Sequence, residues 1–423
     1  MSTNARGDAE VRSRFDLVER DRGGRKRIFF DSAAGSLVLS TARDAIAEAA
    51  MVASVGGACF ADSAFVDSTV ERARDVVDRL VRAPVGSVVT TAESTTAQLR
   101  RLAQALLPRF PRGSRVLVTA CDHNANIDAW RSAAAERGGL DVALVRHGPD
   151  GRLDLDDLAS KATPDTALLA VGHASNVLGV ENPIAEIGAF LRARAPKALL
   201  VVDGVHAVPH FRPDMEGWDA DAYVFSCYKL FAQRGLSYLV LGPRLLTLEP
   251  YHLEPAAPKL PKSWEQGSRN AADFAPMLAF EAYCAWLGEP HGAAAGRRDP
   301  FAGAFAAIQA RESVLAEALL EGARGERGLA DVPGVRVHGP GRFIPGKEPT
   351  VSFTAEGIDP ESLERRLWEE DGIAIRSGTH YAPETLAQTG DKWSARASLA
   401  HYNTLDEVAV FLRAVNRIVG RLA

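Results

Sequence analysis

Short apolar runs rich in β-branched residues alternate with longer amphipathic segments from about Ile28 onward. The strand candidates are SVVTTA, RVLVTA, LDVALVRH, TALLAVGH, ALLVVDGVH, AYVFSCY and LSYLVLG. Helical patterns such as TTAQLRRLAQALLPRF and IAEIGAFLRARA lie between several of them. This alternation predicts the α/β class, with a largely parallel sheet covered by helices on both faces.

Two regions depart from this rhythm. Residues 1–27 are polar and charge-rich, which predicts a flexible N-terminal arm with a short helix around Val11–Glu19. The alternation ends near the Gly/Pro/Arg-rich stretch Pro290–Pro300, after which come a long helix over Phe301–Leu320 and strands around VRVHG, TVSFTAE and IAIRSG. We therefore expect an arm (1–27), a large domain (28–290) and a smaller C-terminal α+β domain (291–423).

The composition narrows the class of protein. Of 423 residues, 46% are hydrophobic and 24% charged, and the net charge of −5 comes from interspersed charges of both signs, so neither a nucleic acid nor an anionic membrane is expected as a partner. No apolar run approaches the roughly 20 residues of a membrane helix, and the N-terminus has no apolar signal core, which predicts a cytoplasmic protein. The cysteines Cys59, Cys121, Cys227 and Cys284 are scattered without CxxC spacing, so we expect neither a disulfide framework nor a metal site.

An aspartate and a lysine end two of the apolar strand candidates. Asp203 closes ALLVVD and Lys229 follows AYVFSCY, at the carboxyl ends where open α/β sheets build their sites. A desolvated lysine suits Schiff-base chemistry, and a carboxylate can keep a pyridine nitrogen protonated so that the ring withdraws electrons. Either residue alone is more often half of a surface ion pair. Together, each at the end of an apolar strand candidate, they indicate a pyridoxal-phosphate (PLP) site in which Lys229 carries the cofactor.

Three further segments agree with a PLP site. Ser94 and Thr95 lie between a strand and a helix, where hydroxyls and free N–H groups bind anions, although alone the segment is equally a plain helix cap. His123 follows the strand RVLVTA and could stack on a cofactor ring, whereas a lone histidine there is more often structural. Arg396 could bind an α-carboxylate, although a surface arginine is the commoner role.

Eight motifs carry a resemblance to a known family. FFDSAAG, DHNANIDAW, GHASNVLGVENP, VDGVHAVPH, FSCYKLF, GSRN, IRSGTHYA and ARASLAHYNT occur in the order seen in class V aminotransferase-fold enzymes. The chain resembles the cysteine desulfurase branch, in particular its desulfurase-like members, from about Ile28 to the C-terminus. The motifs are specific for the fold and the cofactor but much less so for the reaction. The resemblance implies the PLP-dependent transferase-like fold (fold type I) and a homodimer with sites at its interface.

The resemblance also implies roles around the cofactor ring. Lys229 would carry PLP and Asp203 would pair with the pyridinium nitrogen. His123 would stack on the ring, with Asn176 and His206 near its phenolic oxygen.

Further residues would hold the phosphate and the substrate. The resemblance assigns the phosphate to Ser94, Thr95, Ser226 and Tyr228, with Ser268 reaching in from a second subunit. It assigns the substrate carboxylate to Arg396, with Arg376 nearby. The positions of His206 and Tyr228 are more often glutamine and histidine in desulfurases, and both changes are shared with the desulfurase-like members.

The main departure from the desulfurases is a missing cysteine. Enzymes of that type carry a mobile catalytic cysteine just after the motif matched by Arg376–Gly378, whereas this chain continues Thr379–Ala382 and has no cysteine beyond Cys284. Cys121 and Cys227 flank expected site residues, but free cysteines are commonly buried in the core. The usual persulfide acceptor is therefore absent from its place.

We expect an enzyme that acts on an L-amino acid, with Lys229 as the proton shuttle once it is freed. The first hypothesis is a carbon–sulfur β-lyase that eliminates a thiol from an S-substituted L-cysteine, assisted by Tyr381 or its neighbour His380 as proton donor. The second is decarboxylation and oxidative deamination of the same kind of substrate to an aldehyde. Transamination, epimerisation and an atypical desulfuration stay open. A PLP-fold binding protein without catalysis is the alternative from another class, and the joint presence of Lys229, Asp203, His123 and Arg396 disfavours it.

Overall fold

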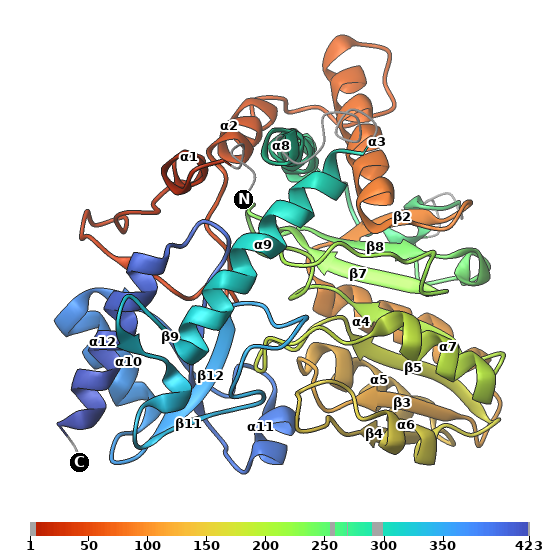
Figure 1. Cartoon of the computed structure of the whole chain (residues 1–423). Helices are drawn as coiled ribbons and strands as arrows, with labels where there is room; N and C mark the ends of the chain where they lie inside the picture. Colours follow the sequence, from red (N-terminus) through yellow and green to blue (C-terminus); the bar gives the residue numbers. More distant parts are fainter. Residues whose placement is uncertain (1–5, 254–258, 269, 290–298, 422–423) are drawn as a thin grey trace.

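The computed structural model describes residues 6–253, 259–268, 270–289 and 299–421. Its centre is a seven-stranded sheet in the order β2-β8-β7-β6-β5-β3-β4 (Figure 1). The strands are β2 (Val88–Ala92), β3 (Arg115–Thr119), β4 (Asp141–Val145), β5 (Thr166–Gly172), β6 (Leu199–Asp203), β7 (Ala222–Ser226) and β8 (Ser237–Leu241). Only the two pairings of β8 are antiparallel. The prediction of an α/β fold with a mainly parallel sheet is confirmed.

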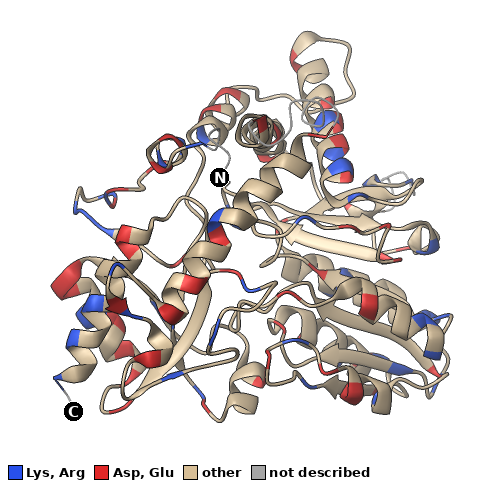
Figure 2. Ribbon diagram, in the orientation of Figure 1, with Lys and Arg blue, Asp and Glu red and all other residues tan. Residues whose placement is uncertain are grey.

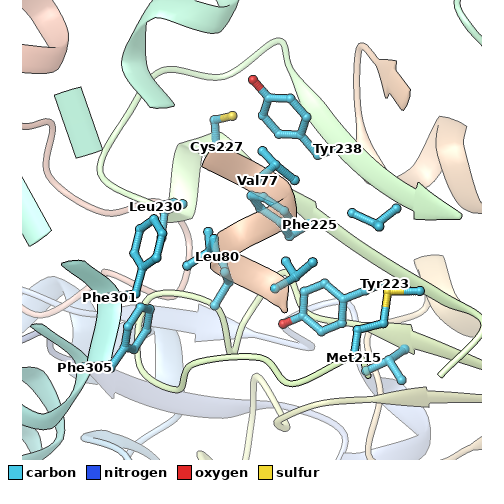
Figure 3. Packing of buried hydrophobic residues seen from close by; sticks show 14 of the residues in the cluster. Val77, Leu80, Met215, Tyr223, Phe225, Cys227, Leu230, Tyr238, Phe301 and Phe305 are labelled. Atoms are coloured by element: carbon cyan, nitrogen blue, oxygen red, sulfur yellow. The ribbon is translucent and has the colours of Figure 1, made fainter. Parts of the chain in front are cut away.

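Apolar residues on both faces of each central strand explain why this sheet is buried. In β6, Leu200 and Val202 belong to the hydrophobic cluster on one face and Val201 to the cluster on the other, because successive side chains of a strand point to opposite faces. The first face is covered by α3 (Ala61–Val81), α6 (Leu155–Lys161), α7 (Ile184–Arg194) and α8 (Ala271–Gly288), and the second by α4 (Thr95–Leu106) and α5 (Ala125–Arg137). Figure 3 shows the first cluster, where Val77 and Leu80 of α3 lie beside Phe225 of β7.

The C-terminal region forms a second, smaller unit with its own core. Its antiparallel sheet has the order β11-β12-β15-β14, and α10, α12 and the last turns of α9 supply buried residues to the same core. These elements are β11 (Val335–Val337), β12 (Thr350–Ala355), β14 (Arg376–Gly378), β15 (Ser394–Ser398), α9 (Pro300–Glu321), α10 (Pro360–Asp371), α11 (Pro383–Thr389) and α12 (Leu405–Gly420). Short pairs join β1 (Ile28–Phe29) to β13 (Ile373–Ala374) and β9 (Gly322–Ala323) to β10 (Glu326–Arg327).

The helix α9 runs from one core into the other (Figure 1). Phe301 and Phe305 are buried in the core of the large unit, whereas Leu315 and Leu319 are buried in the core of the small one. We expected the small domain to begin at residue 291, but the change of core falls inside α9. Residues 290–298 of the Gly/Pro/Arg-rich stretch lie outside the described residues.

The N-terminal segment 6–27 is packed, contrary to the expectation of a flexible arm. The helix α1 (Asp8–Arg12) places Val11 in the large core, and Phe15 follows it there. A guanidinium N–H of Arg12 donates to the carbonyl of Tyr402 at 2.9 Å. The burial of Val11 and Phe15 and the contacts of Arg12 hold the segment on the large unit. The first five residues lie outside the described part of the chain.

Charges of both signs are interspersed over both units, as Figure 2 shows. Among the described residues, no helix combines the length and the apolar character that crossing a membrane requires.

Candidate active site

The carboxyl ends of four neighbouring parallel strands meet at one edge of the large sheet. Because β3, β5, β6 and β7 run in the same direction, the residues that follow them gather at this edge. They include the predicted site residues His123, Asn176, Asp203 and Lys229. Lys229 lies close enough to His123 and Asp203 for each pair to influence a pKa.

Lys229 is a buried amine. It ends the short 3-10 turn Cys227–Lys229 after β7 and is only 5% exposed. Burial, and then the positive charge of Arg396, lower the pKa of Lys229 to about 7, against the opposing effect of Asp203. Among the described residues no carboxylate lies within ion-pair distance of its Nζ. A large fraction of this amine is therefore neutral, and nucleophilic, near neutral pH.

Asp203 is a buried carboxyl group at the end of β6. Its Oδ1 accepts the N–H of Val205 at 2.9 Å, and burial raises the pKa of Asp203 to about 6. A Cβ on the next residue, Gly204, would collide with the hydroxyl of Tyr223, so glycine is required for the turn to pass there. A cationic partner would stabilise the ionised form of this carboxyl group.

The rings of His123 and Tyr381 stack on each other. Their centroids are 5.4 Å apart and their planes differ by 30°. His123 Nδ1 accepts the N–H of Ala125 at 3.1 Å, and burial lowers the pKa of His123 to about 4, so this imidazole is neutral. Tyr381 is 73% exposed and has a left-handed φ of 53°. The loop after β14 therefore brings a phenol, not a thiol, to the edge of the site.

His380, the neighbour of Tyr381, faces away from this position. Its Nε2 lies 3.0 Å from the hydroxyl of Ser394, and burial lowers the pKa of His380 to about 2. Its carbonyl accepts a hydrogen bond from Asn176 Nδ2 at 2.9 Å. Of the two proton donors that we expected from the sequence, only Tyr381 contacts another site residue through its ring.

Hydroxyl groups gather where α4 begins. Ser94 caps this twelve-residue helix by accepting the N–H of Ala97 at 3.2 Å, and Thr95 Oγ1 lies 2.8 Å from Ser226 Oγ. The free N–H groups and the helix dipole favour an anion at this end. Three of the predicted phosphate ligands are thus close together, whereas Ser268 is exposed in the loop before α8.

Arg234 is a cation that sequence reasoning missed. Its guanidinium carbon lies 4.1 Å from the centre of the Tyr228 ring, and its charge contributes to the lowered pKa of Lys229. The only signal in the sequence was a charged residue five positions after Lys229, in a loop without a pattern.

Two arginines from adjacent strands share one aspartate. Arg376 of β14 is paired with Arg396 of β15 in the sheet, and Arg376 donates from Nε and Nη2 to Asp31 at 3.1 and 2.6 Å. Arg396 donates to the carbonyl of Asn176 at 2.9 Å, whereas its Nε is buried without a partner. Arg376 is thus occupied by Asp31, a residue of FFDSAAG that had no assigned role, and Arg396 keeps a free donor for a substrate carboxylate.

Glu348 is a second residue that sequence reasoning missed. His206 Nε2 lies 2.9 Å from Glu348 Oε1, and both side chains are buried. The signal available was the charged pair Lys347-Glu348 directly before the apolar strand β12. Its partner could not be inferred, because 142 positions separate it from His206.

Comparisons with known proteins agree with the fold and identify the family. The model of the family described as aminotransferase class-V matches residues 28–257 and 301–411. A probable cysteine desulfurase from Xylella fastidiosa (strain 9a5c) is 30% identical over 96% of this chain and 94% of its own length. A cysteine desulfurase from Salmonella agona is 30% identical over 97% of both chains. The crystal structure of the cysteine desulfurase CsdA (S-sulfonic acid) from Escherichia coli superposes with a TM-score of 0.81 at 25% identity, covering 99% of this chain and 100% of that one.

Proposed function

Because the chain belongs to the aminotransferase class-V family, whose members depend on PLP, we propose that it is a carbon–sulfur β-lyase acting on an S-substituted L-cysteine. The observation that carries the proposal is the loop after β14. It presents Tyr381 beside His123 where the resemblance predicts a catalytic cysteine in a desulfurase.

The residues at the strand ends fit the cofactor. Asn176 Oδ1 and His206 Nδ1 are buried without any hydrogen-bond partner, as expected of a protein built to bind a polar group there. Lys229 is buried without a carboxylate partner, Asp203 lies near it, and the start of α4 can receive a phosphate. When bound, PLP supplies an electron sink for the pair left at Cα of an amino acid.

The chain's own residues then have separate tasks in this proposal. Arg396 binds the substrate carboxylate through its unpartnered Nε and so fixes the orientation of Cα. Lys229, with its lowered pKa, takes the Cα proton once its nitrogen is free. Asp203 would hold a proton on the ring nitrogen of the cofactor, and the imidazole of His123 would cover one face of the ring. Tyr381 donates a proton to the departing sulfur.

Three of the four cysteines are poorly suited to accept sulfur. Cys121, Cys227 and Cys284 are buried, and burial raises the pKa of each thiol, whereas Cys59 is exposed in the segment before α3. In this proposal sulfur leaves as a free thiol. The Cα–H and Cβ–S bonds break, the thiol takes a proton, and the remaining 2-aminoacrylate reacts with water to give pyruvate and ammonium.

Incubation of the holoenzyme with a panel of S-substituted L-cysteines, followed by mass spectrometry, tests the proposal. We expect equal amounts of thiol and pyruvate from at least one of them, and none from the Lys229→Ala variant. Free L-cysteine turned over to alanine and sulfide at a matching rate would refute the lyase and identify an atypical desulfurase. An aldehyde with carbon dioxide would identify the decarboxylating alternative, and a new amino acid formed from an added 2-oxo acid would identify an aminotransferase.

A further inference from the structure

A chain of buried acidic and histidine side chains extends from the site into the space between the two units. Glu348 Oε1 lies 2.9 Å from His206 Nε2, and Glu348 Oε2 lies 3.8 Å from His210 Nε2. His210 Nδ1 lies 2.8 Å from Glu312 Oε2 on α9. All four residues are at most 5% exposed.

The far end of this chain reaches a cavity of about 420 Å³. His210, Glu312 and Glu348 line it, together with Glu181. His206 does not line the cavity, so the chain leads from the site side to the cavity side. Protons can reach Glu348 from the cavity without passing through the substrate site.

The ring of His206 has one acceptor, the carboxylate of Glu348 at Nε2, and one buried nitrogen, Nδ1, that is left without a partner. A neutral imidazole carries a single N–H, and only the protonated ring donates from both nitrogens. The family resemblance places the phenolic oxygen of the cofactor near His206, and that oxygen is an acceptor. With the cofactor bound, each ring nitrogen would then face an acceptor and both would donate.

We propose that Glu348 is a positioning residue that holds His206 doubly protonated, so that Nδ1 donates to the phenolic oxygen of the bound cofactor. The inference rests on the use of PLP at Lys229 and does not depend on which substrate bond is cleaved.

The surrounding charges support an ionised Glu348. His210, His206 and Lys347 oppose the effect of burial and lower the pKa of Glu348 to about 2. Burial lowers the pKa of His206 to about 3 in the protein alone, with Lys229 and His210 acting in the same direction and Glu348 against them. Without the cofactor His206 is therefore neutral, and in this proposal it takes up its second proton when the phenolic oxygen adds an acceptor at Nδ1 to the effect of Glu348. The charged or titratable groups that face the pair are Lys229, His210, Lys347 and Arg396.

The visible absorbance of the holoenzyme, titrated with pH without substrate, tests this assignment in the Glu348→Gln variant. A positively charged His206 disfavours a proton on the nitrogen of Lys229. Without the anionic Glu348, His206 loses its positive charge. The midpoint of the absorbance titration should therefore rise by about one pH unit, which is roughly a tenfold increase in the proton affinity of that nitrogen. If His206 were neutral beside an ionised Glu348, the substitution would remove a lone negative charge and the midpoint would fall. A fall, or no change, refutes the proposal.

Glu181→Gln is the matched control. Glu181 lines the same cavity but pairs with His173 at 3.1 Å, so its substitution removes an equal charge without touching His206. We expect the parent midpoint in this variant, and an equal upward shift would refute the specific role of Glu348.

A second measurement on the parent holoenzyme does not depend on any variant folding. Nitrogen-15 NMR of the histidine rings should show both nitrogens of His206 protonated at neutral pH. One bare nitrogen would refute the proposal. Neither measurement depends on the products formed from substrates. Failure of the proposed role of Glu348 can therefore be distinguished from failure of the lyase assignment.

Discussion

Replacement of Arg396 by glutamine should make Lys229 a slower nucleophile towards the cofactor. Burial is the largest cause of the lowered pKa of Lys229, and the positive charge of Arg396 is the next. Glutamine keeps a polar, hydrogen-bonding side chain at this position but removes that charge. The pKa of Lys229 then rises, and a smaller fraction of the amine is neutral at a given pH.

The size of the effect follows from the two pKa values. With a pKa of about 7 rather than the usual 10.5, about half of the Lys229 amine is neutral at pH 7, which is on the order of 10³ times the neutral fraction of an ordinary lysine. Removal of a nearby charge shifts a pKa by about one unit or more. At one pH unit below the parent midpoint, the variant should therefore capture the cofactor roughly tenfold more slowly, or slower still for a larger shift.

Stopped-flow mixing of the apoenzyme with PLP, followed through the visible absorbance, measures this rate. In the parent the rate should rise with pH up to about 7 and then level off, whereas in Arg396→Gln it should level off at higher pH. Arg376→Gln is the matched control, because Arg376 is neutralised by Asp31. A variant midpoint equal to or below that of the parent would refute the assigned influence of Arg396, and a parent rate still rising far above pH 7 would refute the lowered pKa itself.

Three further outcomes are expected. Tyr381→Phe should lose about 10²–10⁴-fold in turnover with an unchanged cofactor spectrum, and an unaltered turnover would show that this ring only stacks on His123. Above pH 7, Lys229 should add about 1.4 kcal/mol per pH unit to the free energy of unfolding of the apoenzyme, because the folded state binds this proton less tightly than the unfolded chain. Denaturant titrations of Lys229→Met at several pH values should lack that contribution. An equal dependence of the unfolding free energy on pH in the parent and the variant would contradict it. Phe353→Ala, at a fully buried position of β12, should cost about 3–5 kcal/mol in the same assay, and a cost below about 1 kcal/mol would mean that the core closes around the gap.

The sheet was predictable because its strands are buried on both faces. Such strands are continuous apolar runs, so segments such as ALLVVD stand out without any knowledge of their partners. The packing of Val11 and Phe15 was not predictable, because two isolated apolar residues in a charged segment become informative only once their distant partners are known. The change of core within α9 was hidden for the same reason, since apolar positions recur from one end of the helix to the other.

The same distinction divides the site. Asp203, Lys229 and His123 could be predicted, because the ends of parallel strands meet wherever the strands do. Asp31 and Glu348 could not be predicted, because their partners are far away in the sequence. Arg376 is 345 positions from Asp31, and His206 is 142 positions from Glu348. The motifs supplied the expected contacts to the cofactor, and the polar groups behind those contacts emerged only from the packing of the two units.

The continuity of α9 ties the stability of one half of the molecule to that of the other. Phe305 and Leu319 lie on one uninterrupted helix but in different cores. If one core unfolds, the other therefore loses the part of α9 that packs against it. The melting of the two units is thermodynamically coupled, and calorimetry should record a single endotherm. Occupation of the site by the cofactor should then slow amide exchange in the distant C-terminal turns of α9 as well as at the sheet. Because α9 belongs to both cores, a ligand bound by one unit also protects the other unit from local unfolding.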